Sequence, residues 1–151
     1  GAAANRVPCR SLDDTLTALP ATVQERCFAR MYLMLPLAVA VLSLFWIVSG
    51  LIGFANQETA QAVLTSRGFS PETAMSAVIL GSVVDIVLGG GILVRGWARG
   101  AALGMIAVSF GYLAAAVIWT PDLWAHPLGP TVKVIPGMAL AAVVAAILEP
   151  R

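Results

Sequence analysis

The acidic residue Asp85 stands alone inside an apolar stretch and is the side chain best suited to chemistry. Residues 73–94 contain no other charge. A carboxylate at the centre of a bilayer costs on the order of 3 kcal/mol or more, so such a side chain faces protein or water rather than lipid. Gly81 and Gly89 lie about one helical turn to either side and would let another helix approach this face closely. We therefore predict that a neighbouring helix covers Asp85.

Two roles are open to this carboxyl group. It could relay protons or contact a quinone, with Tyr112 and Trp46 lining a pocket. It could also be a structural hydrogen-bond acceptor for hydroxyl groups on neighbouring helices. The hydroxyl donors in suitable segments are Ser43, Ser49, Ser109 and Tyr112. Such positions are also typical of ordinary helix packing, so both roles stay open.

No other motif in the chain indicates a catalytic centre. The sequence has no Ser–His–Asp arrangement, no paired carboxylates and no cluster of metal ligands. The glycine run at residues 89–91 has no strand before it and lacks the GxGxxG spacing of a nucleotide site. The single histidine, His126, lies outside the apolar segments, so haem is not expected. Cys9 and Cys27 are too far apart for CxxC chemistry. We expect no metal, no nucleic-acid partner and no cofactor motif, and quinone is the candidate ligand.

The composition excludes a soluble globular domain. Of the 151 residues, 59% are hydrophobic and only 11% are charged, whereas soluble domains carry about 25% charged residues. A membrane-spanning helix needs about 20 apolar residues. Four segments meet or approach this length. Near the start of the fourth, the amine of Lys133 is expected to extend to the interface. The segments are residues 32–54, 73–94, 101–119 and 131–148.

These segments predict an all-α fold, an integral membrane four-helix bundle. Pro36 and Pro136 fall in the first turns of their spans, where a missing N–H costs least. Seven of the nine basic residues would lie on one side of the membrane, which the positive-inside rule assigns to the cytoplasm. Both termini are therefore expected there. The seven are Arg6, Arg10, Arg26, Arg30, Arg95, Arg99 and Arg151, of which Arg30, Arg95 and Arg99 would anchor helix ends at the interface.

The chain is expected to divide into a polar N-terminal arm, residues 1–30, and a transmembrane domain, residues 31–151. Leu12, Leu16 and Leu19 have helical spacing, which predicts a short amphipathic helix on the membrane or on a partner. A linker with one helical turn explains the same pattern equally well.

Two outer connections have structure of their own. Residues 57–67 predict a short interfacial helix that stops at Gly68, after which Ser70 and Pro71 have the residue types of an N-cap and a first helical position. The other connection, residues 119–130, contains Trp119 and Trp124, which suit the aromatic belt of a membrane interface.

Three segments carry a resemblance to a known family. They are residues 45–52 (FWIVSGLI), residues 81–89 (GSVVDIVLG) and residues 123–130 (LWAHPLGP). Together they resemble the DoxX-like family of small four-helix membrane proteins over most of residues 29–151. The closest likeness is to the membrane domain fused behind a short-chain-dehydrogenase-like NAD(P)-binding domain in bacterial proteins. Such fusions often have Trp where this chain has Cys27, and commonly an acid where it has His126.

The resemblance implies a membrane redox setting, because DoxX is similar to a small subunit of a thiosulfate:quinone oxidoreductase. We expect a non-catalytic subunit or anchor domain in the bacterial inner membrane, which braces other membrane subunits or an NAD(P)-binding domain. The alternative is a quinone- or small-molecule-handling oxidoreductase component that uses Asp85. A small transporter is a weaker reading, because broken helices and an inverted repeat are lacking. Small residues suited to close helix packing are Gly81, Gly89, Gly100, Gly104, Ala107, Gly111, Gly137, Ala141, Ala142 and Ala145.

Overall fold

The computed structural model describes residues 11–18, 23–124, 132 and 134–148, all helical or in turns. The predicted all-α fold is confirmed for these residues. The chain divides into two compact units, Gly1–Leu33 and Met34–Arg151, each considered by itself. The helices are α1 (Leu12–Ala18), α2 (Val23–Ala55), α3 (Gln57–Thr65), α4 (Pro71–Gly91), α5 (Ala98–Trp119), the short 3-10 helix η1 (Pro121–Trp124) and α6 (Val134–Ile147).

Three of these helices are long and apolar enough to cross a membrane. They are α2, α4 and α5, with 33, 21 and 22 residues, against the roughly 20 that a bilayer core requires. The fourth apolar helix, α6, has only 14 described residues. Large apolar side chains such as Leu80, Phe110 and Ile118 are exposed on the long helices. Water would disfavour so much apolar surface, whereas lipid accommodates it.

Helix α2 begins nine residues before the predicted start of the first span at residue 32. The preceding segment, residues 23–31, contains Gln, Glu, Arg and Ala, which are good helix formers, and no Gly or Pro to stop the helix. As a consequence, the expectation that Pro36 occupies a first turn is wrong for the helix itself, since Pro36 lies inside α2. Pro136 does fall in the first turn of α6.

The connection from α3 to α4 follows the predicted signals. The backbone of Gly68 has a φ of 95°, a conformation that L side chains rarely adopt. The hydroxyl of Ser70 caps α4 by accepting a hydrogen bond from the backbone N–H of Thr73 at 3.2 Å, and Pro71 is the first helical residue. The sequence therefore predicted this turn correctly. Its place at a membrane interface remains a prediction.

Replacing Gly68 with Ala is expected to destabilise the protein by about 1 kcal/mol, because a Cβ atom is strained at positive φ. The measurement is the thermal unfolding midpoint in detergent. Gly96→Ala is the matched control, since Gly96 also lies in a turn outside the helices, a Cβ there would meet no atom within 4 Å, and its φ is not positive. Equal midpoints for the two variants would contradict the prediction.

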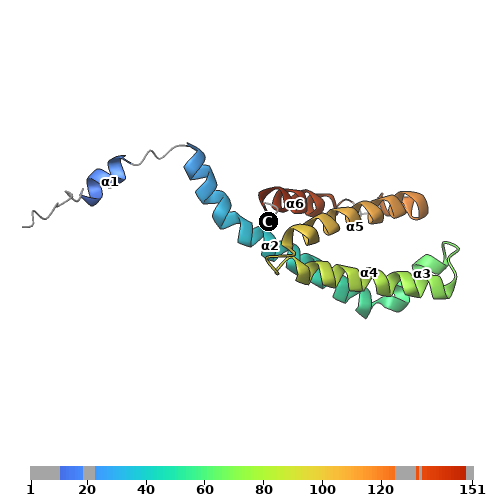
Figure 1. Ribbon diagram of the computed structural model, residues 1–151. Coiled ribbons are helices and arrows are strands. Elements are labelled where there is room, and N and C mark those ends of the chain that lie inside the picture. The colour runs from blue at the N-terminus through green and yellow to red at the C-terminus, as the bar shows by residue number, and fades with distance from the viewer. Residues whose placement is uncertain (1–10, 19–22, 125–131, 133, 149–151) are drawn as a thin grey trace, which may run out of the picture. The chain divides into compact units, whose positions relative to one another are not determined.

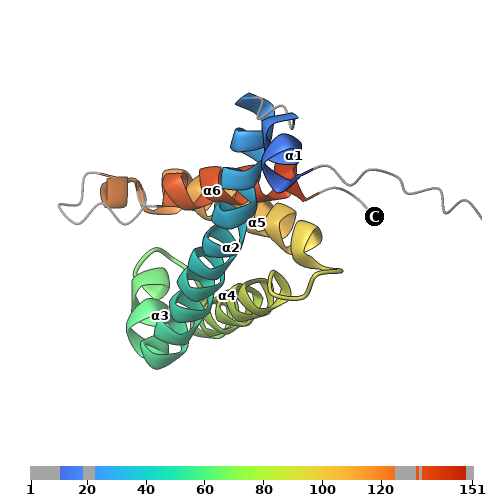
Figure 2. The same ribbon diagram turned by 90° about the vertical axis from the view of Figure 1, so that its left-hand side faces the viewer.

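Helices α2 and α4 lie side by side (Figure 2) because glycines remove the side chains between their backbones. A Cβ atom on Gly50 would lie 2.6 Å from the carbonyl oxygen of Ser82. A Cβ atom on Gly89 would lie 2.8 Å from Cγ1 of Ile47 and 2.9 Å from its backbone nitrogen. All three distances are shorter than real Cβ contacts, so only glycine permits this approach.

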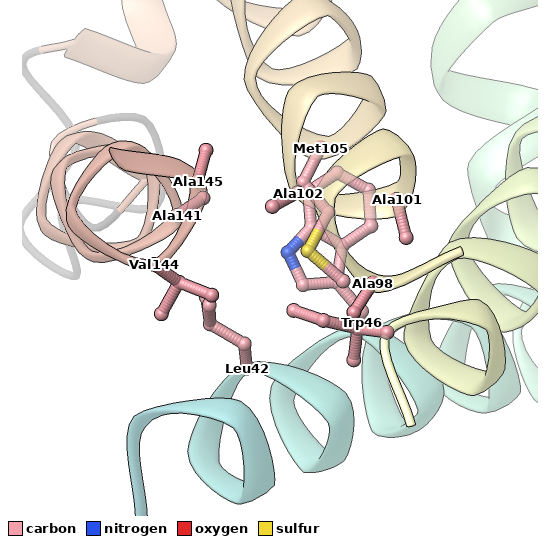
Figure 3. Close-up of a cluster of buried hydrophobic side chains, with 10 residues drawn as sticks. Leu42, Trp46, Ala98, Ala101, Ala102, Met105, Ala141, Val144 and Ala145 are labelled. Atoms are coloured by element: carbon pink, nitrogen blue, oxygen red, sulfur yellow. The ribbon is translucent and has the colours of Figure 1, made fainter. Parts of the chain in front are cut away.

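Helices α5 and α6 also run side by side (Figure 1) and meet α2 in an apolar cluster (Figure 3). Figure 3 shows Leu42 of α2 and Val144 of α6 pointing toward one another, and Trp46 reaching beside Met105 of α5. Alanines make up most of the rest, which keeps the helices close. The buried cluster is Leu42, Trp46, Ile92, Ala98, Ala101, Ala102, Met105, Ala141, Val144 and Ala145.

Candidate functional site

Asp85 is buried between three helices, with 6% of its surface exposed. The Tyr112 hydroxyl on α5 donates a hydrogen bond to its Oδ1 at 2.9 Å. The Ser49 hydroxyl on α2 donates to its Oδ2 at 3.2 Å. Each carboxylate oxygen thus has a hydroxyl partner from a different helix. This arrangement offsets part of the cost of placing a carboxyl group inside an apolar segment.

Glycines near these side chains leave enough room for the two hydrogen bonds to Asp85 to form. Gly50 lets the backbone of α2 approach α4, which brings the neighbouring Ser49 within reach of the carboxyl group. Gly81 leaves room for the phenol on the other side, since a Cβ there would lie 3.2 Å from the hydroxyl oxygen of Tyr112. The two hydrogen bonds therefore require space at these glycines as well as the polar side chains themselves.

The carboxyl group lines a pocket of about 510 Å³ formed by α2, α3, α4 and α5. A volume of this size is typical of small-molecule sites, which combine an apolar lining with a few polar groups. Ser49 and Tyr112 are both exposed residues, Tyr112 with 42% of its surface accessible. The polar lining residues are Ser49, Ser82, Asp85 and Tyr112, and the apolar ones include Leu64, Phe69, Val78, Ala115 and Trp119.

An aromatic pair borders the pocket at the end of α5. The rings of Phe69 and Trp119 meet edge to face, with centroids 5.6 Å apart. The guanidinium of Arg67 donates a hydrogen bond to the carbonyl oxygen of Trp119 at 2.7 Å. This hydrogen bond and the ring contact hold the connection between α3 and α4 against the last residue of α5, beside the pocket.

The sequence model of the DoxX-like family matches residues 43–142, about two thirds of the chain. The chain belongs to the DoxX-like family. The match covers all three residues of the Asp85 hydrogen-bond network, and together with the long apolar helices it identifies a multi-pass membrane protein in contact with lipid. No curated protein and no solved structure matches this chain.

The predicted polar residues of this DoxX-like protein separate into two groups. Ser49 and Tyr112 bond to Asp85, whereas Ser43 and Ser109 are buried outside the pocket lining. Trp46 was expected to line a pocket with Tyr112. It is instead 5% exposed and packs in the apolar cluster between α2 and α5 (Figure 3).

One pocket residue, Ser82, was not among the sequence candidates. It is buried on α4 and lies three residues before Asp85, on the same helix face. That spacing is the signal that would have found it. A Cβ atom on Gly53 of α2 would collide with the Ser82 hydroxyl oxygen, so α2 and α4 remain close at this level too.

The glycines predicted to aid packing have different surroundings. A Cβ atom on Gly104 would lie 2.8 Å from Cδ2 of Leu88, where α5 meets α4. Gly111 has no atom within 4 Å of where its Cβ would be. The structure therefore brings Gly50, Gly89 and Gly104 into helix contacts and leaves Gly111 on an open face of α5.

The predicted interface anchors are all exposed where the structure describes them. They are Arg30, Arg95, Arg99, Trp119 and Trp124. Lys133 lies outside the described residues, as do Cys9, His126 and the terminal arginines Arg6, Arg10 and Arg151. Within the part of the chain that the structure describes, no group of three His, Cys, Asp or Glu side chains is placed to hold a metal ion.

Proposed function

We propose that this chain holds a small lipophilic molecule with a hydrogen-bonding head group, of the quinone or quinol class, in the pocket at Asp85. The observation that carries the proposal is the joining of an apolar pocket to a compact polar end made by Asp85, Tyr112 and Ser49. A quinone combines polar and apolar parts in the same way, because its ring oxygens are polar and the rest of the molecule is apolar.

The direction of the hydrogen bonds favours the reduced form of such a ligand. Tyr112 and Ser49 both donate their hydroxyl protons to Asp85. Their oxygen lone pairs are then available to accept a hydrogen bond from a ligand O–H group. A quinol supplies such donors, whereas a quinone carbonyl would require one of the hydroxyls to turn away from Asp85.

Equilibrium binding to the purified protein in lipid nanodiscs tests this proposal. Decylubiquinol and decylubiquinone are suitable probes, because they differ only in the redox state of the head group. We expect both to bind, with the quinol the tighter ligand. Absence of saturable binding for both probes would refute the proposal.

We also propose that α6 is a fourth span and that both termini face the cytoplasm of a bacterial inner membrane. The 14 residues of α6 extend about 21 Å, which is shorter than the roughly 30 Å apolar core, so as a span α6 would require the bilayer to thin locally. The arginines that precede the apolar part of α2, together with Arg95 and Arg99 around the start of α5, support this orientation.

Cysteine labelling tests the proposed orientation. In a background with Cys9→Ser and Cys27→Ser, we introduce Thr59→Cys on α3 or Gly96→Cys between α4 and α5, both at exposed positions. A membrane-impermeant maleimide should label residue 59 in intact cells and residue 96 only in inverted vesicles, because the arginines hold the second connection inside. The reverse pattern would overturn the proposed topology.

The role of subunit or anchor, expected from the sequence, is the second candidate. One feature favours it: α2 begins at Val23, nine residues before the predicted span, so polar helical residues precede the apolar part of this helix. An NAD(P)-binding domain in the same chain or a separate redox subunit would be the partner. This role predicts co-purification with a larger complex that Asp85→Asn leaves intact.

A further inference from the structure

Asp85 has no positively charged residue on the apolar segments around it. It is the sole charge in residues 73–94, and residues 31–55 of α2 and 100–119 of α5 contain no Lys, Arg or His. The hydroxyls of Ser49 and Tyr112 bond to the carboxyl group without neutralising a charge on it. An unpaired buried carboxylate is costly, so a bound cation, either a proton or a metal ion, would stabilise it.

Four oxygen-bearing side chains from three helices line the pocket at this position. Asp85 and Ser82 come from α4, Ser49 from α2 and Tyr112 from α5. Ser82 lies about one helical turn before Asp85. Its hydroxyl oxygen lies against Gly53, which is one turn of α2 beyond Ser49. Hard cations prefer oxygen ligands such as these, so the pocket has suitable ligand atoms for one.

The Ser82 hydroxyl is a ligand atom that the hydrogen-bond network does not use. Ser82 is 5% exposed and lines the pocket, yet its hydroxyl has no hydrogen-bond partner among the residues that the structure describes. No fully buried polar atom lacks a partner in that part of the chain, so this oxygen must be accessible from the pocket. An unpaired polar group on a buried residue is commonly explained by a bound water or ion.

The single carboxylate determines which charge of ion the pocket can hold. A monovalent cation would give a neutral site, whereas a divalent cation would leave a net positive charge inside the apolar region. Divalent ions usually require several carboxylate, histidine or cysteine ligands, and no such group of three occurs in the described ranges. An alkali-metal ion needs no group of this kind, because neutral oxygens can complete its coordination.

We propose that Asp85, Ser49, Ser82 and Tyr112 together bind one alkali-metal ion of the sodium class. The carboxylate neutralises the ion, and the three hydroxyls direct oxygen lone pairs toward it. Ser49 and Tyr112 do so by rotating their O–H groups away from Asp85. This inference goes beyond the proposed function and does not depend on it, since the ion requires no lipophilic ligand in the pocket.

Sodium binding to the unaltered chain in phosphatidylcholine nanodiscs is the direct test. Radiolabelled sodium is titrated at a fixed alkaline pH, where protons compete least, and N-methylglucamine chloride keeps the ionic strength constant. We expect saturable binding that unlabelled sodium chloride displaces. Binding that does not saturate, or that equals binding to protein-free nanodiscs, would overturn the inference. Because no quinol is present, that result would leave the proposed function standing.

Three variants locate the ion. Asp85→Asn removes the neutralising charge and should abolish saturable binding. Ser82→Ala removes one neutral ligand and should weaken binding about tenfold, or about 1.4 kcal/mol. Ser109→Ala is the matched control, because Ser109 is buried to a similar degree, 3% exposed against 5%, and lies outside the pocket lining. It should bind sodium like the unaltered chain. Equal affinities in the two serine variants, or saturable binding by Asp85→Asn, would contradict the site.

Thermal unfolding gives a second measurement on the unaltered chain. A ligand that binds only the folded chain raises the unfolding midpoint, by an amount set by its concentration relative to the dissociation constant. Sodium chloride should therefore raise the midpoint above the value in N-methylglucamine chloride at equal ionic strength. The difference should be lost in Asp85→Asn and retained in Ser109→Ala. Equal midpoints of the unaltered chain in the two salts would overturn the inference.

Discussion

Asp85→Asn is expected to weaken decylubiquinol binding by about tenfold while the protein retains its helical fold. The carboxyl group accepts one hydrogen bond at each oxygen, from Tyr112 and from Ser49. An amide keeps the shape and one acceptor, but its NH₂ group donates and cannot accept a hydrogen bond. One hydroxyl must then turn away, and the arrangement that orients both lone pairs toward the ligand is lost. The measurement is the dissociation constant in nanodiscs, with circular dichroism to verify the helix content.

Three further variants separate the network from general packing. Tyr112→Phe and Ser49→Ala each remove one hydroxyl that would accept from the ligand, so each should weaken binding about as much as Asp85→Asn does. Ser109→Ala is the control, since Ser109 is a buried hydroxyl on the same helix as Tyr112 but outside the pocket lining. It should bind like the unaltered protein. Unchanged affinity in Asp85→Asn would show that the carboxyl group has no part in ligand binding.

Gly89→Ala is expected to destabilise the protein by about 1–3 kcal/mol, the usual cost of overpacking. Its Cβ atom would lie 2.9 Å from the backbone nitrogen of Ile47 and 3.1 Å from the carbonyl oxygen of Ser43. Backbone atoms cannot turn aside as a flexible side chain can, so α2 and α4 must separate. Because Ser49 and Asp85 bridge the same two helices, quinol binding should weaken as well. The measurement is the unfolding midpoint in a detergent titration.

The neighbouring glycine provides the control for this prediction. A Cβ atom on Gly90 would meet nothing within 4 Å. Gly90→Ala should therefore leave stability unchanged or raise it by up to about 1 kcal/mol through better helix propensity. If the two variants unfolded at the same point, the close approach at Gly89 would not contribute to stability.

The helical elements could be predicted because their signals are local. A long uncharged apolar segment identifies a span, and the Gly68, Ser70 and Pro71 sequence identifies a turn followed by a helix start. The predicted first span starts at residue 32 because the apolar character begins there, whereas helix α2 itself begins at Val23. Backbone hydrogen bonding does not stop at the membrane boundary when the preceding residues favour helix.

The candidate site was predictable only in part. A lone carboxyl group in an apolar segment indicates a buried polar contact whatever the fold, since lipid cannot satisfy it. The choice of Ser49 and Tyr112 among four hydroxyl candidates depends on which faces of α2 and α5 turn toward α4. Trp46 shows why residue spacing alone was not enough. It lies one helical turn before Ser49, which is compatible with lining the same pocket, yet its ring packs against α5 (Figure 3).

The order of apolar segments along the chain and the isolation of one acid among them follow from residue types alone, because the transfer of each side chain out of water depends little on its distant neighbours. The partners of that acid and the pocket around it arise only in the folded chain. Helix rotation and approach are decided by contacts such as Gly50 against Ser82 and Gly89 against Ile47. Those contacts join residues more than thirty positions apart, and no local pattern specifies which glycine meets which backbone.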